Sequence, residues 1–458
     1  MSPNDYRALA DAVAADIAAG RLPAGAQLPT QRDFAYARNI APSTASRVYA
    51  ELNRRGLISG EVGRGSYVRA PELTGTSGLG EPTQAKVDLQ LNFPMLPGQD
   101  IEIAQVISGV LSGLARPGGP AGQSGAFRPI SGGGTPAARA ATASFLARAA
   151  WRPDPDGIVF TANGRQGLAA AFAALAPPGE RIGVEALTYP AVKWIAARLG
   201  ITLVPLAMDA HGMKPDAILR AHRATPLKAI YVQPTLHNPL SVSMDAVRRA
   251  EIAEVVKSEG LMVVEDQIYG FLAEDPPLCT LAPDHTLLVD SLSKRVSPGL
   301  TLGFIAGPAA WSGRMVAAVR SGAWAVSAFP LTLGLQVMAD GLATRLVAGK
   351  RADALVRQAI LRDVFDPSMI QTDPRSYHAW LELPEPWRAE AFSAAAARRG
   401  IAVTPSSAFA VTPGHAPNAV RLALSPPSHE ELRTALLTLS QLRNSGPMDS
   451  SLLDGELE

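Results

Sequence analysis

The sequence predicts an α/β protein in two parts: a small helical domain with a hairpin, followed by a much larger domain built on a mostly parallel sheet. At 458 residues the chain exceeds the size at which one hydrophobic core keeps growing, so more than one domain is expected. The first seventy residues show helical spacing and then a glycine-rich hairpin pattern. From about residue 87, apolar β-type runs alternate with helical segments, which indicates a sheet covered by helices.

The composition is typical of a globular protein and excludes several classes. Hydrophobic residues make up 47% of the chain and charged residues 18%. We expect a cytoplasmic protein, because no apolar run reaches the length of a membrane span and the N-terminus lacks a basic-then-apolar signal pattern. Cys279 is the single cysteine, which excludes an intramolecular disulfide and a cysteine-rich metal site. We predict no metal. The net charge of +1 creates no overall attraction to nucleic acid.

Two short helices are expected first. Leu9, Val13 and Ile17 recur at helical spacing, and the glycines and proline that follow end this helix. The second helix begins at about Thr30, a plausible N-cap, and carries Phe34 inward.

The third helix has the features of a recognition helix. It opens with two hydroxyls, has an arginine one turn later and buries two apolar residues: Ser43, Thr44, Arg47, Val48 and Leu52. Amides and hydroxyls at a helix N-terminus hold phosphate while the first turns face base edges. A hairpin follows, and its tip offers Arg64 to the adjacent groove. On patterns alone, a three-helix bundle with a hairpin and no DNA-binding role fits equally well.

Three motifs make this segment resemble the winged helix of the GntR family of bacterial regulators. They are Gly25-x-x-Leu28-Pro29-Thr30-x-Arg32, Tyr49-x-x-Leu52-x-x-x-Gly56-Leu57-Ile58 and Gly63-x-Gly65-Ser66-Tyr67-Val68. The resemblance implies promoter DNA as a partner and DNA contacts from Arg32, Ser43, Thr44, Arg47 and Arg64. Many relatives carry Ser-Arg at the start of the recognition helix where this chain has Ala41-Pro42, so their sequence preference does not transfer.

Domain boundaries follow from composition. We assign residues 1–70 to the winged helix and residues 71–86, rich in Gly, Thr, Ser, Pro and Glu, to a linker. The large domain then covers residues 87–445, and the polar residues 446–458 form a flexible tail.

Five apolar runs separated by helical segments define the sheet of the large domain. They are residues 157–160, 181–185, 229–232, 261–264 and 285–289. Continuous apolar strands of this kind belong to a mostly parallel sheet covered on both faces, and polar residues at their ends are candidates for a site.

Three strand ends carry a consistent chemistry. The turn after the first strand contains Gly164 and Arg165, where free amides and the helix dipole can hold phosphate. Asp266 directly follows a buried strand, with Tyr269 three residues later, and such a carboxylate can keep a pyridine nitrogen protonated. Lys294 ends the next strand and can form an imine. Each has a plain alternative: a simple turn, a helix cap and a surface lysine.

In this order, the motifs resemble the aminotransferase fold that binds pyridoxal 5'-phosphate (PLP), fold type I, over about residues 87 to 440. The resemblance implies a large part at about 130–330 and a small part at about 331–445. It implies that Lys294 is the Schiff-base lysine and that Asp266 pairs with the pyridine nitrogen. Tyr269 and Asn238 would bind the ring oxygen, Tyr189 would stack on the ring, and phosphate would contact Gly164, Arg165 and Ser291. Arg421 would grip the carboxylate of an amino-acid effector or substrate.

Departures from that pattern lie on the phosphate side. Relatives carry an arginine that pairs with the phosphate where this chain has Thr301, and a charge-assisted contact of that kind contributes about 1.5–3 kcal/mol. Phe127 lies roughly where a partner-subunit tyrosine usually reaches the phosphate, and the usual Asn-Pro-Thr-Gly continues here as Leu240-Ser241. Weaker PLP binding would suit a sensor, with Arg295 or Arg165 as compensating cations.

A winged helix followed by this fold is the layout of the MocR subgroup of GntR regulators. The expected function is therefore a PLP-responsive transcriptional regulator that senses PLP or an adduct of PLP with an amino compound, and regulatory relatives suggest a homodimer. Two alternatives stay open: an active PLP-dependent aminotransferase with an N-terminal appendage, and a DNA-binding protein whose large domain is a cofactor-free dimerisation platform.

Overall fold

The computed structural model describes residues 6–18, 21–22, 26–54, 57–61, 65–68, 85–115, 126–127, 129–149, 151–412 and 414–447. Its contacts form two units. The terminal unit contains Met1–Leu91, Leu361–Ile370 and Trp380–Glu458, and the sheet unit contains Asn92–Ile360 and Gln371–Ala379. Within these described ranges, no helix is long and apolar enough to cross a membrane, and no three His, Cys, Asp or Glu side chains gather as metal ligands.

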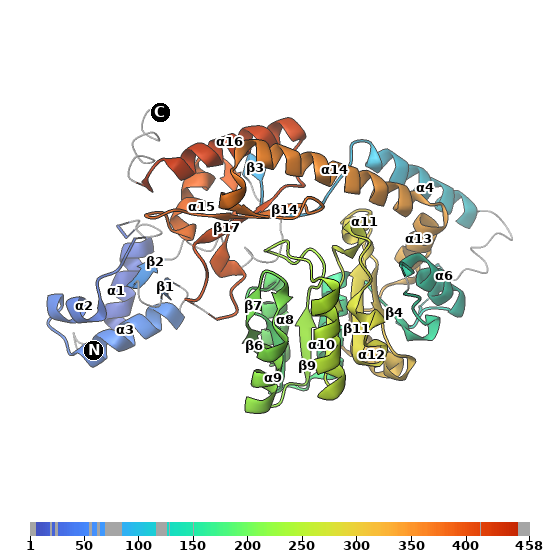
Figure 1. Ribbon diagram of the computed structural model, residues 1–458, viewed down its shortest axis with the longest axis horizontal. Helices are drawn as coiled ribbons and strands as arrows, with labels where there is room; N and C mark the ends of the chain where they lie inside the picture. The colour runs from blue at the N-terminus through green and yellow to red at the C-terminus, as the bar shows by residue number, and fades with distance from the viewer. Residues whose placement is uncertain are drawn as a thin grey trace. The chain divides into compact units, whose positions relative to one another are not determined.

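The N-terminal part of the terminal unit has the three helices and the hairpin that the sequence predicts (Figure 1). The elements are α1 (Tyr6–Ala18), α2 (Gln31–Ala37), α3 (Pro42–Arg54), β1 (Ile58–Glu61) and β2 (Gly65–Val68). Thr30 is the N-cap of α2, because its hydroxyl accepts a hydrogen bond from Asp33 N at 3.2 Å. The hairpin tip, with Arg64, lies outside the described residues.

The core of this small domain forms around α3. Val48 and Leu52 are fully buried, and the rings of Phe34 and Tyr49 meet edge to face with centroids 5.4 Å apart. Tyr49 also donates a hydrogen bond to Pro29 O at 2.5 Å, which ties α3 to the residues before α2. The apolar residues that set the helical periodicity are therefore the ones that hold the three helices together.

The sequence patterns missed a third strand-like segment beside the hairpin. Leu28 N donates to Ser66 O at 2.8 Å and Val68 N donates to Ala26 O at 2.9 Å, so residues 26–28 pair along β2. A stretch this short has no alternation from which pairing could be read.

The rest of the terminal unit is built around short strands and two helices. A four-stranded sheet has the order β13 (Ile370–Gln371), β14 (His378–Glu382), β17 (Ala419–Ala423) and β16 (Thr404–Pro405), of which Gln371, His378 and Ala379 are assigned to the sheet unit. β3 (Val87–Asp88) pairs in parallel with β15 (Ile401–Ala402), and the helices are α15 (Ala389–Arg398) and α16 (His429–Asn444). Ser428 and Glu431 form a capping box that starts α16.

The sheet unit contains a seven-stranded sheet, which confirms the prediction of a mostly parallel sheet. Its order is β4 (Ile158–Thr161), β12 (Gly303–Ala306), β11 (Thr286–Ser291), β10 (Met262–Asp266), β9 (Ala229–Val232), β5 (Arg181–Glu185) and β6 (Thr202–Leu206). β12 is antiparallel to both of its neighbours, β4 and β11, and the other neighbouring strands pair in parallel.

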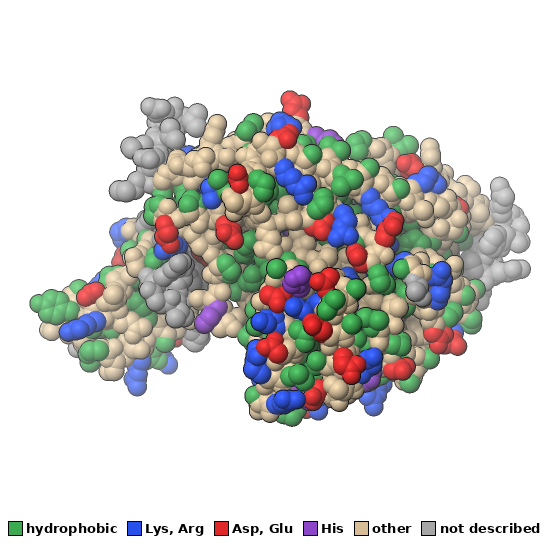
Figure 2. Space-filling view, viewed as in Figure 1, with side chains coloured by type: hydrophobic (Ala, Val, Ile, Leu, Met, Phe, Trp, Pro, Cys, Tyr) green, Lys and Arg blue, Asp and Glu red, His purple; other side chains and the backbone are tan. Residues whose placement is uncertain are grey.

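A series of helices begins in the sheet unit, and some of them pack against the seven strands. They are α4 (Gln99–Leu114), α6 (Pro136–Leu146), α7 (Gly164–Leu175), α8 (Pro190–Leu199), α9 (Pro215–Ala224), α10 (Ala246–Ser258), α11 (Leu292–Arg295), α12 (Ser312–Ser321), α13 (Ala328–Ala339) and α14 (Leu342–Val364). Figure 1 shows α9 and α10 side by side along the sheet. Figure 2 shows basic and acidic side chains interspersed over that face, in keeping with a net charge of +1.

Alternation along β9 shows how the two faces of the sheet differ. Ile230 and Val232 pack into the cluster formed with α9 and α10, whereas the ring of Tyr231 meets Phe172 of α7 edge to face at 5.9 Å. Because successive side chains of a strand point to opposite faces, Tyr231 lies on the α7 side.

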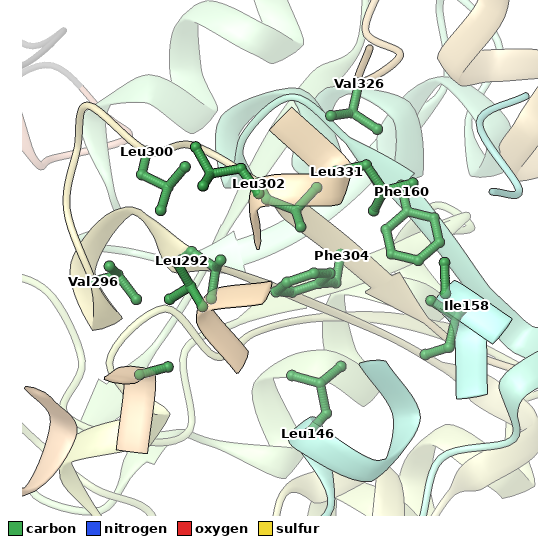
Figure 3. Packing of buried hydrophobic residues seen from close by; sticks show 14 of the residues in the cluster. Leu146, Ile158, Phe160, Leu292, Val296, Leu300, Leu302, Phe304, Val326 and Leu331 are labelled. Atoms are coloured by element: carbon green, nitrogen blue, oxygen red, sulfur yellow. The ribbon is translucent and has the colours of Figure 1, made fainter. Parts of the chain in front are cut away.

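A second apolar cluster lies beneath the lysine-bearing turn. It joins side chains from α6, β4, α11, β12 and α13, labelled in Figure 3 as Leu146, Ile158, Phe160, Leu292, Phe304 and Leu331. Leu292 and Val296, which flank Lys294 in the sequence, are fully buried in it. The turn that presents Lys294 is therefore held by packing at both of its ends.

Candidate functional site

Lys294 lies in α11, one short turn beyond the end of β11. The sequence placed it at the strand end, but β11 stops at Ser291, whose hydroxyl caps the turn by accepting from Ser293 N at 3.3 Å. The amine of Lys294 donates to Asn92 O at 2.5 Å. It also lies 4.6 Å from the ring centroid of Phe93 and 4.8 Å from that of Tyr269. The amine is thus held between two aromatic rings.

Asp266 is a buried carboxylate at the end of β10. Tyr231 Oη donates to Oδ2 at 2.8 Å and Ile268 N donates to Oδ1 at 3.0 Å. Burial raises the pKa of Asp266 from 3.8 to about 6, while these two hydrogen bonds and the nearby Lys294 oppose the rise. At neutral pH the group is still mainly ionised, so it can pair with a protonated ring nitrogen.

The start of α7 gathers the residues expected to bind phosphate. Asn163 Oδ1 accepts from Gln166 N at 3.0 Å and caps the helix, which leaves Gly164 and Arg165 at its first two positions, where backbone amides have no partner within a helix. A Cβ built on Gly164 would lie 3.5 Å from Ser291 Oγ, so these two residues are neighbours.

Arg165 and Tyr189 are in direct contact. Arg165 Nε donates to Tyr189 Oη at 3.0 Å, which joins the expected ring-stacking residue to the expected phosphate residues. The sequence left Arg165 and Arg295 open as replacements for the cation missing at Thr301. Arg295 is committed elsewhere: its guanidinium pairs with buried Asp290. Arg165 is therefore the better placed of the two.

Asn238 has a buried side-chain amide. Its backbone N donates to Gln233 Oε1 at 3.3 Å, but its side-chain Oδ1 is buried without a hydrogen-bond partner among the described residues. An amide oxygen accepts, whereas a hydrogen bond to a cofactor ring oxygen would be donated by Nδ2. The lysine, the buried carboxylate and the helix N-terminus are the features that fit a pyridine ring with a phosphate arm.

Several residues of this site were not identified from the sequence. Tyr231 holds Asp266, and its only signal is a hydroxyl within an apolar strand. Lys350 of α14 donates to the carbonyls of Lys294 at 2.9 Å and Val296 at 2.7 Å, and burial lowers its pKa from 10.5 to about 7. Asn92 contacts both Lys294 and Tyr269. Their partners lie far away in the sequence, so no local motif marks them.

Arg421 lies in the terminal unit, on β17. One of its terminal nitrogens donates to Gln90 O at 2.5 Å and to Thr404 Oγ1 at 3.1 Å, and the guanidinium lies 5.4 Å from the ring centroid of Phe409. Only 6% of the residue is exposed. Its orientation is therefore fixed by the protein.

The expected DNA contacts of the winged helix that lie within the described residues are exposed or half-buried. Arg32, Ser43 and Arg47 are exposed and Thr44 is half-buried, while the opposite side of α3 forms the core. The guanidinium of Arg47 lies 6.0 Å from the ring centroid of Tyr6. Tyr36 of α2, 91% exposed, was not singled out from the sequence and is a further large side chain on this surface.

Comparison with known proteins identifies two family models along the chain. The model described as aminotransferase class I and II matches residues 119–439. The model described as bacterial regulatory proteins, gntR family, matches residues 5–68.

Individual relatives span nearly the whole chain. The uncharacterized HTH-type transcriptional regulator YdeF of Bacillus subtilis is 28% identical over 443 residues, covering 95% of this chain and 94% of that protein. The vitamin B6 salvage pathway transcriptional repressor PtsJ of Salmonella typhimurium is 24% identical over 440 residues, 95% and 97% of the two chains. Among solved structures, the α-aminoadipate aminotransferase LysN of Thermus thermophilus, complexed with N-(5'-phosphopyridoxyl)-L-leucine, has a TM-score of 0.69 at 21% identity, covering 78% of this chain and 92% of that one.

Proposed function

Because the chain belongs to the aminotransferase class I and II family and begins with a gntR-type domain, we propose that it is a MocR-type regulator of transcription that responds to pyridoxal 5'-phosphate. One observation carries this proposal: an amine held between aromatic rings, near a buried carboxylate, occurs in the same chain as a helix that presents Ser43 and Arg47 to solvent. The similarity to PtsJ, which is named as a transcriptional repressor of the vitamin B6 salvage pathway, supports the same ligand class.

In this proposal each side chain of the sheet unit has a defined role. PLP supplies an aldehyde that condenses with an amine and a ring that withdraws electrons. Lys294 provides the amine, and the Asp266 carboxylate holds the ring nitrogen in its protonated form. Tyr269 and Asn238 donate hydrogen bonds to the ring oxygen, and Tyr189 stacks on the ring. The phosphate contacts come from Gly164, Arg165 and Ser291.

Recognition of DNA would use the first turns of α3 and the wing. Ser43, Thr44 and Arg47 would contact the groove and its phosphates, with Arg32 at the start of α2 and Arg64 in the wing as further basic contacts. We propose a homodimer in a cytoplasmic setting, because half-sites on DNA pair naturally with two-fold protein symmetry. An amino compound held by Arg421 would be the second effector. Ligands would shift operator affinity by favouring one arrangement of the two winged helices.

The test is a titration of PLP into the full-length protein, with absorbance and binding to its upstream promoter fragment measured together. We expect an absorbance band at about 420 nm and a change in DNA affinity at the same PLP concentrations. Lys294→Ala should lose both responses but keep DNA binding, whereas Arg47→Ala should keep the band and lose DNA affinity. A promoter complex that is indifferent to PLP would contradict the proposal.

An active aminotransferase is the second candidate function. The fixed orientation of the Arg421 guanidinium supports it. A guanidinium fixed by Gln90 O and Thr404 Oγ1 is suited to gripping a substrate carboxylate in one geometry. Incubating the PLP-loaded protein with single amino acids and measuring keto-acid formation would distinguish the two. Turnover that Lys294→Ala abolishes would favour the enzyme, and DNA binding without turnover would favour the regulator.

A further inference from the structure

A chain of hydrogen bonds through buried side chains leads to the hydroxyl of Tyr269. His378 Nε2 lies 3.0 Å from His237 O, His378 Nδ1 lies 3.3 Å from Asn92 Nδ2, and the same Asn92 nitrogen lies 2.7 Å from Tyr269 Oη. His378 is fully buried, and Asn92 and Tyr269 are 4% and 3% exposed. All four residues belong to the sheet unit.

The direction of this chain follows from what each atom can do. A backbone carbonyl only accepts, so the hydrogen facing His237 O is carried by His378 Nε2. In the neutral ring, His378 Nδ1 is then an acceptor, and the side-chain atom of Asn92 that faces it must be the NH2 group. Ser376 Oγ, 3.2 Å from the same ring nitrogen, is a hydroxyl that can donate to it as well. The histidine tautomer thus fixes the orientation of the asparagine amide.

The orientation of the Asn92 amide in turn determines whether the Tyr269 hydroxyl accepts or donates in their hydrogen bond. The NH2 group of Asn92 has two hydrogens, one directed to His378 Nδ1 and the other to Tyr269 Oη. Tyr269 Oη accepts from Asn92, so its own hydrogen must be directed to a different acceptor. The Tyr269 ring lies 4.8 Å from the Lys294 amine, where an aldehyde-bearing ring would be held.

We infer that Asn92 and His378 are positioning residues that keep Tyr269 as a hydrogen-bond donor toward the ring oxygen of bound PLP. In the loaded protein this role rests on the function proposed above. A hydrogen bond donated to the ring oxygen stabilises the negative charge of that oxygen most when the nitrogen that joins Lys294 to PLP has lost its proton. The donor therefore lowers the pH at which the absorbance band of the bound cofactor changes. Loss of the donor should raise that midpoint by about one to two pH units.

The first experiment needs no cofactor. The full-length protein is labelled with ¹⁵N-histidine, and the signals of His378 are assigned by their loss in His378→Phe. At neutral pH we expect a neutral ring with its hydrogen on Nε2. A hydrogen on Nδ1 alone, or a doubly protonated ring, would overturn the inference, since the Asn92 amide would then have the opposite orientation.

The second experiment is a double-mutant cycle on the PLP-loaded protein, read as the pH midpoint of the absorbance band. Tyr269→Phe removes the donor, and Asn92→Asp replaces the NH2 group with a carboxylate oxygen that draws the tyrosine hydrogen away. Each should raise the midpoint by about one to two pH units. Asn92→Asp should add no further shift in the Tyr269→Phe background. Gln441→Glu, on the exposed side of α16, adds the same net charge and should match the wild type.

The outcomes distinguish an effect of hydrogen-bond direction at Tyr269 from a direct effect of the charge that Asn92→Asp adds. Equal shifts from Asn92→Asp with and without the tyrosine hydroxyl would mean that the added charge acts directly, which overturns the inference. If Asn92→Asp does not fold, His378→Phe releases the amide to rotate and should shift the midpoint in the same direction; an unchanged midpoint there is equally contradictory. If the wild type gains no band with PLP, the proposed function fails, and the histidine spectrum still decides the polarity of the chain.

Discussion

Replacing Asp266 with asparagine should stabilise the cofactor-free protein while weakening its affinity for PLP. Burial raises the pKa of this carboxyl from 3.8 to about 6, a difference of about 2 pH units. At about 1.36 kcal/mol per unit, ionised Asp266 costs the cofactor-free fold about 3 kcal/mol. Asparagine carries no charge, and it retains an oxygen for Ile268 N while the Tyr231 hydroxyl can accept from its NH2 group.

The raised pKa of Asp266 determines how the stability difference between Asp266→Asn and the wild type changes with pH. Because the folded-state pKa is raised, the native protein binds more protons than the unfolded chain between about pH 4 and pH 6. The penalty is absent below this window, grows through it and is complete above about pH 6. Asp266→Asn should therefore gain little near pH 4 and up to about 3 kcal/mol at pH 7.5, relative to the wild type.

Denaturant unfolding of the cofactor-free proteins, at pH 4.5 and pH 7.5, measures the stability change. PLP titration of the same two proteins measures the cost in affinity. A charge-assisted hydrogen bond to the ring nitrogen contributes about 1.5–3 kcal/mol, so the variant should bind PLP about 10- to 100-fold more weakly. A variant that is less stable than the wild type at both pH values, or that binds PLP equally well, would refute the reasoning.

Four further predictions concern other parts of the chain. Thr301→Arg should tighten PLP binding by about 10- to 100-fold in an absorbance titration, because it restores a cation near the phosphate; unchanged affinity would contradict this. Arg47→Ala should weaken DNA binding across all sequences and reduce the slope of log affinity against log salt by about 1, measured by fluorescence anisotropy. Leu52→Ala, at a fully buried position, should destabilise the winged helix by about 2–5 kcal/mol, seen in thermal unfolding. Lys350 has a lowered pKa of about 7, so the wild type should gain stability relative to Lys350→Met as pH rises from 7 toward 10.5, by about 1.4 kcal/mol per unit; a pH-independent difference would count against it.

Much of the fold could be predicted because apolar periodicity is local. The spacing of Leu9, Val13 and Ile17 marks α1, and the hydroxyl of Thr30 marks the start of α2. The strands of the large sheet appear as short apolar runs for the same reason: helices cover both faces, so most of the strand side chains are buried and apolar. The site residues at strand ends follow from that topology.

The remaining parts of the site depend on contacts between distant segments. Asn92 and His378 are separated by 286 residues, and neither stands in a motif that predicts a partner. The pairing of Arg295 with Asp290, which removes that arginine as a phosphate ligand, depends on the direction in which α11 leaves β11. Residues 26–28 pair along β2 without any alternation to predict it. These features are set by packing, which no local pattern records.

The phosphate side of the site bears on the choice between regulator and enzyme. An enzyme benefits from a cofactor that never leaves, whereas a sensor responds only if its dissociation constant is close to the concentration it must measure. Thr301 removes one cation, and Arg295 is held by Asp290, so Arg165 at the start of α7 is the cation best placed for phosphate. The ring side keeps Lys294, Asp266 and Tyr269. In the proposed regulator, capture of the aldehyde would thus be preserved while the phosphate anchor would be weakened, and a weakened anchor would serve reversible sensing better than catalysis.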